Sequence, residues 1–197
     1  MKRHRHVWTV VMIALALTAC AKSFDMSGER LTPLGPEWGI VIGSVLVKPV
    51  KTADKGAKSQ DATDATYEFD IVQSPPGDPE GERPYAERYR LESKGGEERI
   101  FISRLHTGTY LLKSFAQDRM VGAGGDLALV FESMAGEIRY IGRLVVEVPQ
   151  RVSRGKEYRF TVENARAATM TQISNRYPEL ATQAVDAPMQ TREPPSP

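Results

Sequence analysis

The sequence is poor in the residue types on which most catalytic and metal sites depend. It contains one cysteine, Cys20, and three histidines, two of which lie within the first six positions. A chain with one thiol cannot form an internal disulfide, and its cysteine and histidines do not have the spacing of a zinc site. These shortages argue against thiol and metal chemistry, and they imply a fold that is stabilised by its hydrophobic core alone.

A strong charge of either sign and long apolar runs are also missing. The 26 basic and 25 acidic residues leave a formal net charge of +1, so the basic excess that is typical of nucleic-acid-binding proteins is lacking. Beyond the first twenty residues, no apolar stretch approaches the roughly 20 residues that a membrane-spanning helix needs. Length and composition are those of a single ordinary globular domain.

What the sequence does contain is a distinctive N-terminus. Lys2, Arg3 and Arg5 form a positively charged start, and residues 7–17 form an apolar run that is too short to cross a bilayer as a helix. The run leads into the sequence LTAC, in which Cys20 is the last residue. This order of charge, apolar run and small residues predicts a signal peptide.

The sequence LTAC resembles the lipobox of bacterial lipoproteins, in which an aliphatic and two small residues precede a cysteine. The resemblance implies that the thiol of Cys20 receives a diacylglyceryl group, that residues 1–19 are removed, and that the new amino group is acylated. Two or more acyl chains hold a protein stably on a membrane. Ala21, in place of an aspartate, implies the outer membrane on its periplasmic side. A secretory signal with a chance cysteine and an uncleaved anchor are the alternatives.

The remainder of the chain predicts a mainly β domain over residues 39–181. Tyr67, Phe69 and Ile71 alternate with polar residues, and residues 158–162 repeat this pattern, which is typical of half-buried strands. Seven or eight short strands separated by turn residues favour an antiparallel sandwich over a closed barrel. The other expected strands cover residues 39–47, 88–91, 98–104, 109–115, 127–131 and 137–148.

The segments on either side of these strands are predicted to be less regular. Residues 20–38 have no clear period and are expected to form the lipidated N-terminus and a tether. Asn164 can cap one short C-terminal helix over residues 165–176, which Pro178 would end. Residues 182–197 are polar and finish in a proline-rich sequence, so they are predicted to be a disordered tail.

Two segments resemble stretches of known domains. HTGTYLLKSF is similar to the G-x-Y-x-L strand of carboxypeptidase-regulatory-like and transthyretin-like domains. FESMAGEIRYIGRLVVEV is similar to a GE-x-x-Y-I-G stretch of bacterial envelope lipoproteins. The resemblance covers residues 38–178 and implies a seven-stranded prealbumin-like sandwich with Tyr110 and Tyr140 in its core or on a sheet face. It implies no chemistry.

Candidates for catalysis are few. His106 lies in a predicted turn, where an exposed polar role is expected rather than that of a base or a ligand. An apolar strand follows the glycines of residues 122–126, which favours a hairpin turn over a phosphate-binding loop. Glu97 and Glu98 are adjacent at a strand start, so their side chains point apart and do not suit a glycosidase pair. The sequence therefore predicts no enzyme, no cofactor and no metal.

One face of the longest expected strand has a composition that suits a protein contact. Arg139, Arg143 and Arg159 are predicted to share one sheet face, with the aliphatic residues Ile141 and Val145 beside the first two. Mixed arginine and aliphatic surfaces suit contacts with a partner, although an ordinary outer sheet face or a charge-guarded edge has the same composition.

The sequence thus predicts a membrane-anchored module that binds or scaffolds another envelope protein. A binder of a small molecule or a glycan is the alternative, and an unrecognised envelope hydrolase is a third interpretation. The shape of the domain discriminates between the first two. A flat apolar patch favours a protein partner, whereas a concave pocket with convergent polar groups favours a ligand.

Overall fold

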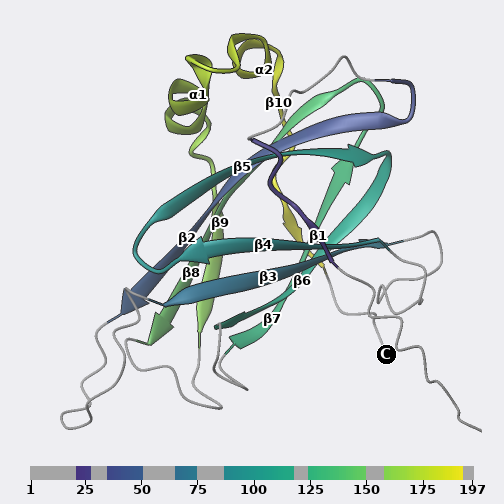
Figure 1. Cartoon of the computed structure of the whole chain (residues 1–197). Helices are drawn as coiled ribbons and strands as arrows, with labels where there is room; N and C mark the ends of the chain where they lie inside the picture. Colours follow the sequence, from purple (N-terminus) through teal and green to yellow (C-terminus); the bar gives the residue numbers. More distant parts are fainter. Residues whose placement is uncertain are drawn as a thin grey trace, which may run out of the picture.

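The computed structural model describes residues 21–27, 35–50, 65–74, 87–117, 124–149 and 158–192. The predicted signal peptide and Cys20 lie outside these ranges. In the described part of the chain, the predicted mainly β architecture is confirmed. Two sheets face each other across a hydrophobic core, and two short helices lie on the outer side of one sheet (Figure 1).

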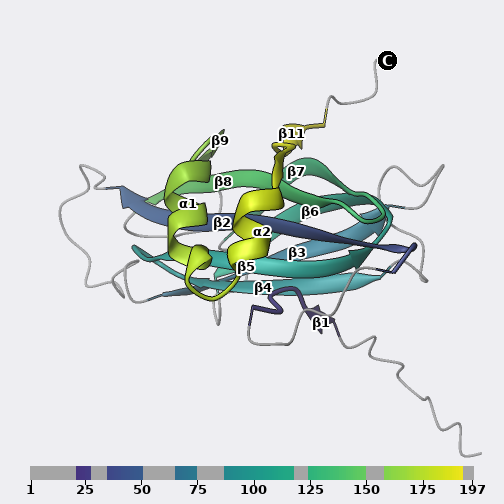
Figure 2. The same ribbon diagram turned by 90° about the horizontal axis from the view of Figure 1, so that it is seen from above.

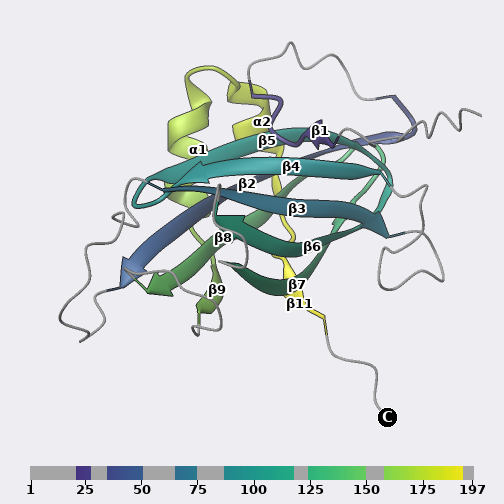
Figure 3. The ribbon, with the colours of Figure 1, turned by 60° about the horizontal axis from the view of Figure 1, so that its bottom comes forward.

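The first layer is a six-stranded sheet. Its strands are β1 (Lys22–Ser23), β3 (Thr66–Ser74), β4 (Arg88–Lys94), β6 (Gly108–Gln117), β7 (Gly124–Ser133) and β11 (Gln190–Thr191), in the order β1-β4-β3-β6-β7-β11. The four long strands are antiparallel neighbours, and the two-residue strands β1 and β11 extend the opposite edges (Figure 3). Tyr67, Phe69 and Ile71 are fully buried on its inner face, as their alternation predicts.

The second layer is a five-stranded sheet. Its strands are β2 (Trp38–Val50), β5 (Glu98–His106), β8 (Ile138–Pro149), β9 (Arg159–Glu163) and β10 (Val185–Asp186). Strand β2 lies between β5 and β8, and both β9 and β10 pair with the other edge of β8.

The expectation of a purely antiparallel sandwich is wrong, because β2 and β8 run parallel along most of their length. The short strands β1 and β10 also pair in parallel with their neighbours. Alternating side chains indicate which face of a strand is buried, and they carry no information about the direction of the strand beside it. Three of the eleven described strands have only two residues, which is too short for any periodic signal.

The single expected helix is two helices, α1 (Arg166–Ser174) and α2 (Pro178–Gln183). The Asn164 side chain accepts a hydrogen bond from the backbone N–H of Arg166 at 3.1 Å, close to the expected cap. Pro178 does more than end the first helix, because its fixed φ and missing donor suit the first position of the next one. The two helices lie side by side over the outer face of the five-stranded sheet (Figure 2).

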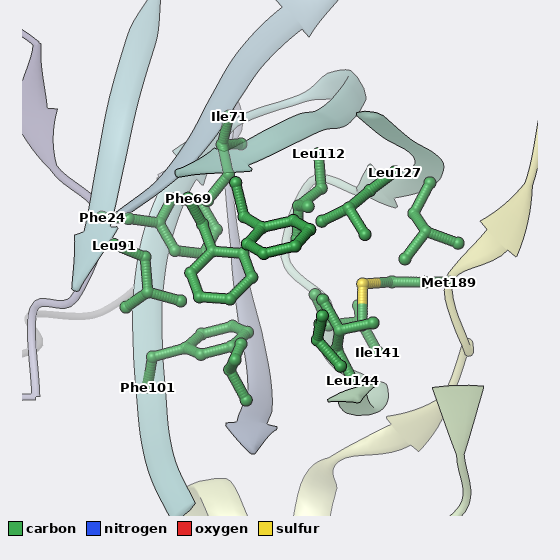
Figure 4. Close-up of a cluster of buried hydrophobic side chains, with 14 of the residues drawn as sticks. Phe24, Phe69, Ile71, Leu91, Phe101, Leu112, Leu127, Ile141, Leu144 and Met189 are labelled. Carbon is green, nitrogen blue, oxygen red and sulfur yellow. The ribbon is translucent and has the colours of Figure 1, made fainter. Parts of the chain in front are cut away.

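The five-stranded sheet is therefore buried on both faces. Its inner face packs against the six-stranded sheet in the main core, part of which is drawn in Figure 4. Its outer face carries a second cluster that the helices cover, made of Ile40, Ile42, Ile102, Ile138, Tyr140, Met170, Ile173, Leu180 and Ala184. Burial on both faces explains why β2 reads as a continuous apolar run rather than an alternating one.

The expected tether over residues 20–38 is wrong in its described part, because residues 21–27 are docked on the fold. We call this segment the N-terminal strap. Its Phe24 side chain is buried in the main core. The backbone N–H of Phe24 donates to Arg90 in β4, and that of Met26 donates to Ile102 in β5. The N-terminal strap thus joins an edge of one sheet to an edge of the other.

The expected disordered tail over residues 182–197 is wrong for the same reason up to residue 192. We call residues 184–192 the C-terminal strap. It pairs with β8 through β10 and with β7 through β11, so it crosses from one sheet to the other on the opposite side of the molecule (Figures 2 and 3). Met189 is buried in the main core between these two pairings. Residues 193–197 lie outside the described ranges.

Candidate functional site

The N-terminal strap forms the first candidate site, next to the predicted lipid attachment. Ala21 is the residue after Cys20, and consecutive Cα atoms are about 3.8 Å apart. The predicted attachment residue, Cys20, therefore directly precedes a docked segment in the sequence. A cavity of about 420 Å³ lies beside it, lined by Ala21, Ser23, Asp25, Arg90, Leu91, Glu92 and Arg99.

Asp25 contributes a carboxylate to the lining of this cavity. Its carboxylate pairs with Arg99 and accepts the backbone N–H of Ser27 at 2.9 Å. The backbone N–H of Ile102 in β5 lies 3.4 Å from the same carboxylate. The Asp25 side chain is 7% exposed, whereas that of Arg99 is 53% exposed. Asp25 therefore holds the N-terminal strap in place, and its partner Arg99 is the group that reaches solvent.

Two further ion pairs on this side have the same arrangement. Lys22 lies 2.7 Å from Glu87, and Arg90 lies 3.2 Å from Glu68. In both pairs the cation is more exposed than the carboxylate. The hydrogen bond from Lys22, together with one from Tyr89, lowers the pKa of Glu87 below its ordinary value. In three ion pairs of this edge the cation is therefore the more exposed partner, whereas in the Lys94–Glu97 pair at the end of β4 the carboxylate is.

The C-terminal strap forms the second candidate site, and its charges are arranged the other way round. The Arg139 side chain is 18% exposed and contacts the carboxylates of Glu137 at 2.8 Å and Glu132 at 3.2 Å, whereas Glu132 is 57% exposed. Arg143 lies 3.8 Å from Glu163, and here too the arginine is less exposed than the carboxylate. A cavity of about 360 Å³ lies here, lined by Val130, Phe131, Glu132, Arg139, Asp186, Ala187, Pro188 and Gln190.

The predicted contact residues of β8 do not share a face. Ile141 is buried in the main core, whereas Arg143 and Val145 lie on the opposite, helix-covered side of the sheet. The reason is a bulge at Gly142, whose φ of +96° is accessible chiefly to glycine and which shifts the pairing of β2 with β8. Beyond a bulge, every side chain changes face. The mixed arginine and aliphatic surface expected at Arg139, Ile141, Arg143 and Val145 is therefore not present.

Arg143 is held across the outer face of the five-stranded sheet. Its guanidinium forms two hydrogen bonds with Glu98 of β5, from Nε at 2.8 Å and from Nη2 at 2.9 Å. This bidentate contact crosses over the central strand β2. Both side chains are largely buried. Arg159 is exposed on the neighbouring β9, away from Arg139. The role of Arg143 that the structure supports is to cover the end of the sheet that the helices leave open.

The remaining candidate residues are held by packing. The His106 ring stacks on Trp38 with ring centroids 3.7 Å apart, and the guanidinium of Arg104 lies 4.6 Å from the Trp38 ring. Gly125 lies in β7 against the ring of Tyr158 rather than in a turn. Within the described ranges, no group of three or more histidine, cysteine or acidic residues could hold a metal ion.

Large exposed apolar side chains are few in the described part of the chain. They are Val50, Met134 and Val185, which lie at the end of β2, in the turn before β8 and in β10. They do not form one flat apolar patch. Neither described helix is long and apolar enough to cross a bilayer.

Comparison with known proteins adds no functional assignment. No protein-family model matches the chain, and no curated protein matches it. A solved structure of a leucine-rich repeat protein from Bacteroides thetaiotaomicron is similar at 10% sequence identity and a TM-score of 0.30. The similarity covers 73% of this chain and 16% of that one. A likeness at this level supports no conclusion about fold or function.

Proposed function

We propose that this protein is a lipoprotein of the bacterial envelope, anchored through acylated Cys20, whose β domain binds another envelope protein without performing catalysis. The observation that supports the anchor is the sequence LTAC followed at once by a docked strap. We assign the outer membrane and its periplasmic side on the basis of Ala21. The two facing sheets support a sandwich, and a prealbumin-like relationship remains part of this proposal.

The side of the domain away from the anchor is the surface that we propose for the partner. Exposed carboxylates gather there at Glu132, Glu137, Glu163 and Asp186 around more buried arginines. The described surface lacks the flat apolar patch that was expected of a protein partner. Transient protein interfaces are about as polar as the rest of a protein surface, so such a patch is not required. Complementary charge accelerates association and selects the partner. We therefore expect the partner to present a basic surface.

The anchor is tested by metabolic labelling with a fatty-acid analogue. The wild-type protein should incorporate the label and remain with the outer-membrane fraction. The Cys20→Ser variant should lose both properties, because no other thiol is present. Equal labelling of the two proteins would contradict the proposal.

The partner surface is tested by co-purification from native membranes. Reversal of charge in the Glu132→Lys variant should reduce recovery of the partner. The matched control is Glu97→Lys, which changes a similarly exposed carboxylate in the turn between β4 and β5. Unchanged recovery with Glu132→Lys would remove this surface from consideration.

The cavity at the C-terminal strap supports a second candidate, the binding of a small polar molecule or a glycan. Its volume of about 360 Å³ lies at the lower end of the range for ligand pockets. Its lining includes the polar side chains of Arg139 and Gln190. Under this alternative, glycan fragments should raise the melting temperature of the wild-type protein and should not affect the Arg139→Ala variant.

A further inference from the structure

We propose that the N-terminal edge of the domain, formed by β1, β4 and the strap beside β5, lies directly on the phospholipid headgroups, so that the protein stands on its membrane in one orientation. This inference rests on the lipidation of Cys20 proposed above. The domain would then not move on a long tether, as was expected for residues 20–38.

The first argument is the length of chain between lipid and domain. An extended segment of 18 residues, such as residues 21–38, could reach roughly 60 Å from its anchor. The structure shortens this distance, because β1 begins at Lys22 and pairs with Tyr89 and Arg90 of β4. Only one residue, Ala21, separates the acylated cysteine from the sheet.

The second argument is that the strap is firmly held. The Phe24 ring makes edge-on contacts with Tyr89, Phe101 and Phe131, at centroid distances of 5.8, 5.3 and 6.1 Å. The strap also forms backbone hydrogen bonds with both sheets, and the Tyr177 hydroxyl donates to the Ser27 carbonyl. Releasing the strap would expose a buried aromatic side chain and break these bonds. The strap is therefore a rigid connection rather than a hinge.

The third argument is that basic side chains are the more exposed charges on this edge. In its ion pairs, Lys22, Arg90 and Arg99 are more exposed than their carboxylate partners. Arg88 and Lys94 are also exposed on this edge, so the exposed cations outnumber the exposed carboxylates Glu92 and Glu97. Basic groups next to a membrane are attracted to the phosphates and anionic lipids at its surface. The opposite edge presents carboxylates, which a negatively charged surface would repel.

These arguments predict different distances from the bilayer for the two edges of the six-stranded sheet. Five strand spacings of about 4.8 Å place β11 about 24 Å from β1 across the sheet. Figure 3 shows the two strands on opposite sides. Glu92 is exposed on β4, and Thr191 is exposed on β11. Because Cys20 is the only cysteine and would be acylated, a cysteine introduced at either position can be labelled selectively.

The experiment uses the full lipidated protein in vesicles of phosphatidylethanolamine and phosphatidylglycerol that contain a headgroup-attached quencher. A fluorophore on Glu92→Cys should be quenched several-fold more strongly than one on Thr191→Cys. Equal quenching in lipidated protein would overturn the inference. Shielding of the Glu92→Cys label from both lipid-borne and aqueous quenchers would show a protein covering this edge and would also overturn it.

A linker variant supplies the matched control. It places an additional alanine and a Gly/Ser segment of about 16 residues, about 20–24 Å end to end on average, between Cys20 and Ala21. The sequence around the acylated cysteine is preserved, and the difference between the two labels should largely disappear. A difference that persists with the linker would overturn the role of the short connection. Recovery of unlipidated protein would instead contradict the proposed function.

Discussion

The two ends of the described chain close opposite sides of the sandwich by the same means. On one side Phe24 of the N-terminal strap enters the core between β4 and β5, and on the other Met189 of the C-terminal strap enters it between β7 and β8 (Figure 4). Each strap pairs with both sheets and covers edges that would otherwise expose unpaired backbone groups. A fold without disulfides is thus closed by its own chain ends.

The two edges differ in what they present to solvent. The cation is the more exposed partner in three ion pairs of the N-terminal edge, whereas the carboxylate is the more exposed partner in the ion pairs of the C-terminal edge. Counting charges would not reveal this difference, because the paired groups nearly cancel on each side. The difference becomes visible only when the exposure of the cation is compared with that of the carboxylate in each ion pair. We infer that one edge is suited to a phosphate-rich membrane surface and the other to a basic partner.

The largest expected effect is that of Phe24→Ala. Truncation of a buried aromatic side chain costs about 3–5 kcal/mol in free energy of unfolding, and here it leaves a cavity beside Phe101 and Phe131. Urea denaturation of the protein measures the change. Ser27→Ala in the same strap is the control and should change stability by less than about 0.5 kcal/mol. A loss below 1 kcal/mol for Phe24→Ala would mean that the N-terminal strap is not part of the core.

The corresponding change on the other side, Met189→Ala, is expected to have a smaller effect. Its cost should be about 2–3 kcal/mol, because methionine is flexible and its neighbours can partly fill the space. The same urea titration compares the two edges, with the exposed Gln190→Ala as control. A larger loss for Met189→Ala than for Phe24→Ala would reverse the order that we assign to the two straps.

The bulge that separates the faces of β8 is probed by Gly142→Ala. A side chain at φ +96° is strained, and its Cβ would lie 2.8 Å from Cγ1 of Val162, so we expect a loss of about 1–3 kcal/mol. Gly136→Ala is the matched control, because its φ is +72° and no atom lies within 4 Å of the added Cβ. Thermal unfolding should show a smaller loss for Gly136→Ala. Equal losses would mean that only backbone strain matters.

The smallest expected effect concerns acid stability at the N-terminal edge. The bond with Lys22 lowers the pKa of Glu87 in the folded state. Its contribution is therefore present above the unfolded pKa and is lost as the pH falls through the lowered folded pKa. Glu87→Gln should lose about 0.2–1 kcal/mol at neutral pH, and the gap from wild type should close in acid. Melting temperatures across pH 3–7, with Glu92→Gln as control, test this; a gap that widens in acid would contradict it.

Sequence patterns predicted the part of the fold in which burial is periodic. Tyr67, Phe69 and Ile71 are buried as their alternation indicates. The straps escaped prediction because each contributes one side chain to the main core, Phe24 or Met189, in a segment without a periodic pattern, while their backbone hydrogen bonds leave no trace in the sequence. The position of each strap therefore depends on contacts with segments that are distant in the sequence.

The failed prediction at the candidate contact face had a signal that could have revealed it. Gly142 interrupts a long apolar strand, and a glycine inside a strand often marks a bulge. Allowing for that bulge would have placed Ile141 and Arg143 on opposite faces, as observed. The direction of β8 relative to β2 had no such signal, because it depends on the path of the chain through both sheets.

Hydrogen exchange at the backbone amides of Phe24 and Met26, in the lipidated protein, tests the central claim most directly. These amides donate to Arg90 at 2.9 Å and to Ile102 at 2.7 Å. If the N-terminal strap is docked, both should be protected to a degree approaching that of the core strands. Exchange at the rate of an unstructured chain would show that the proposed anchor leads into a free tether, and it would contradict the account.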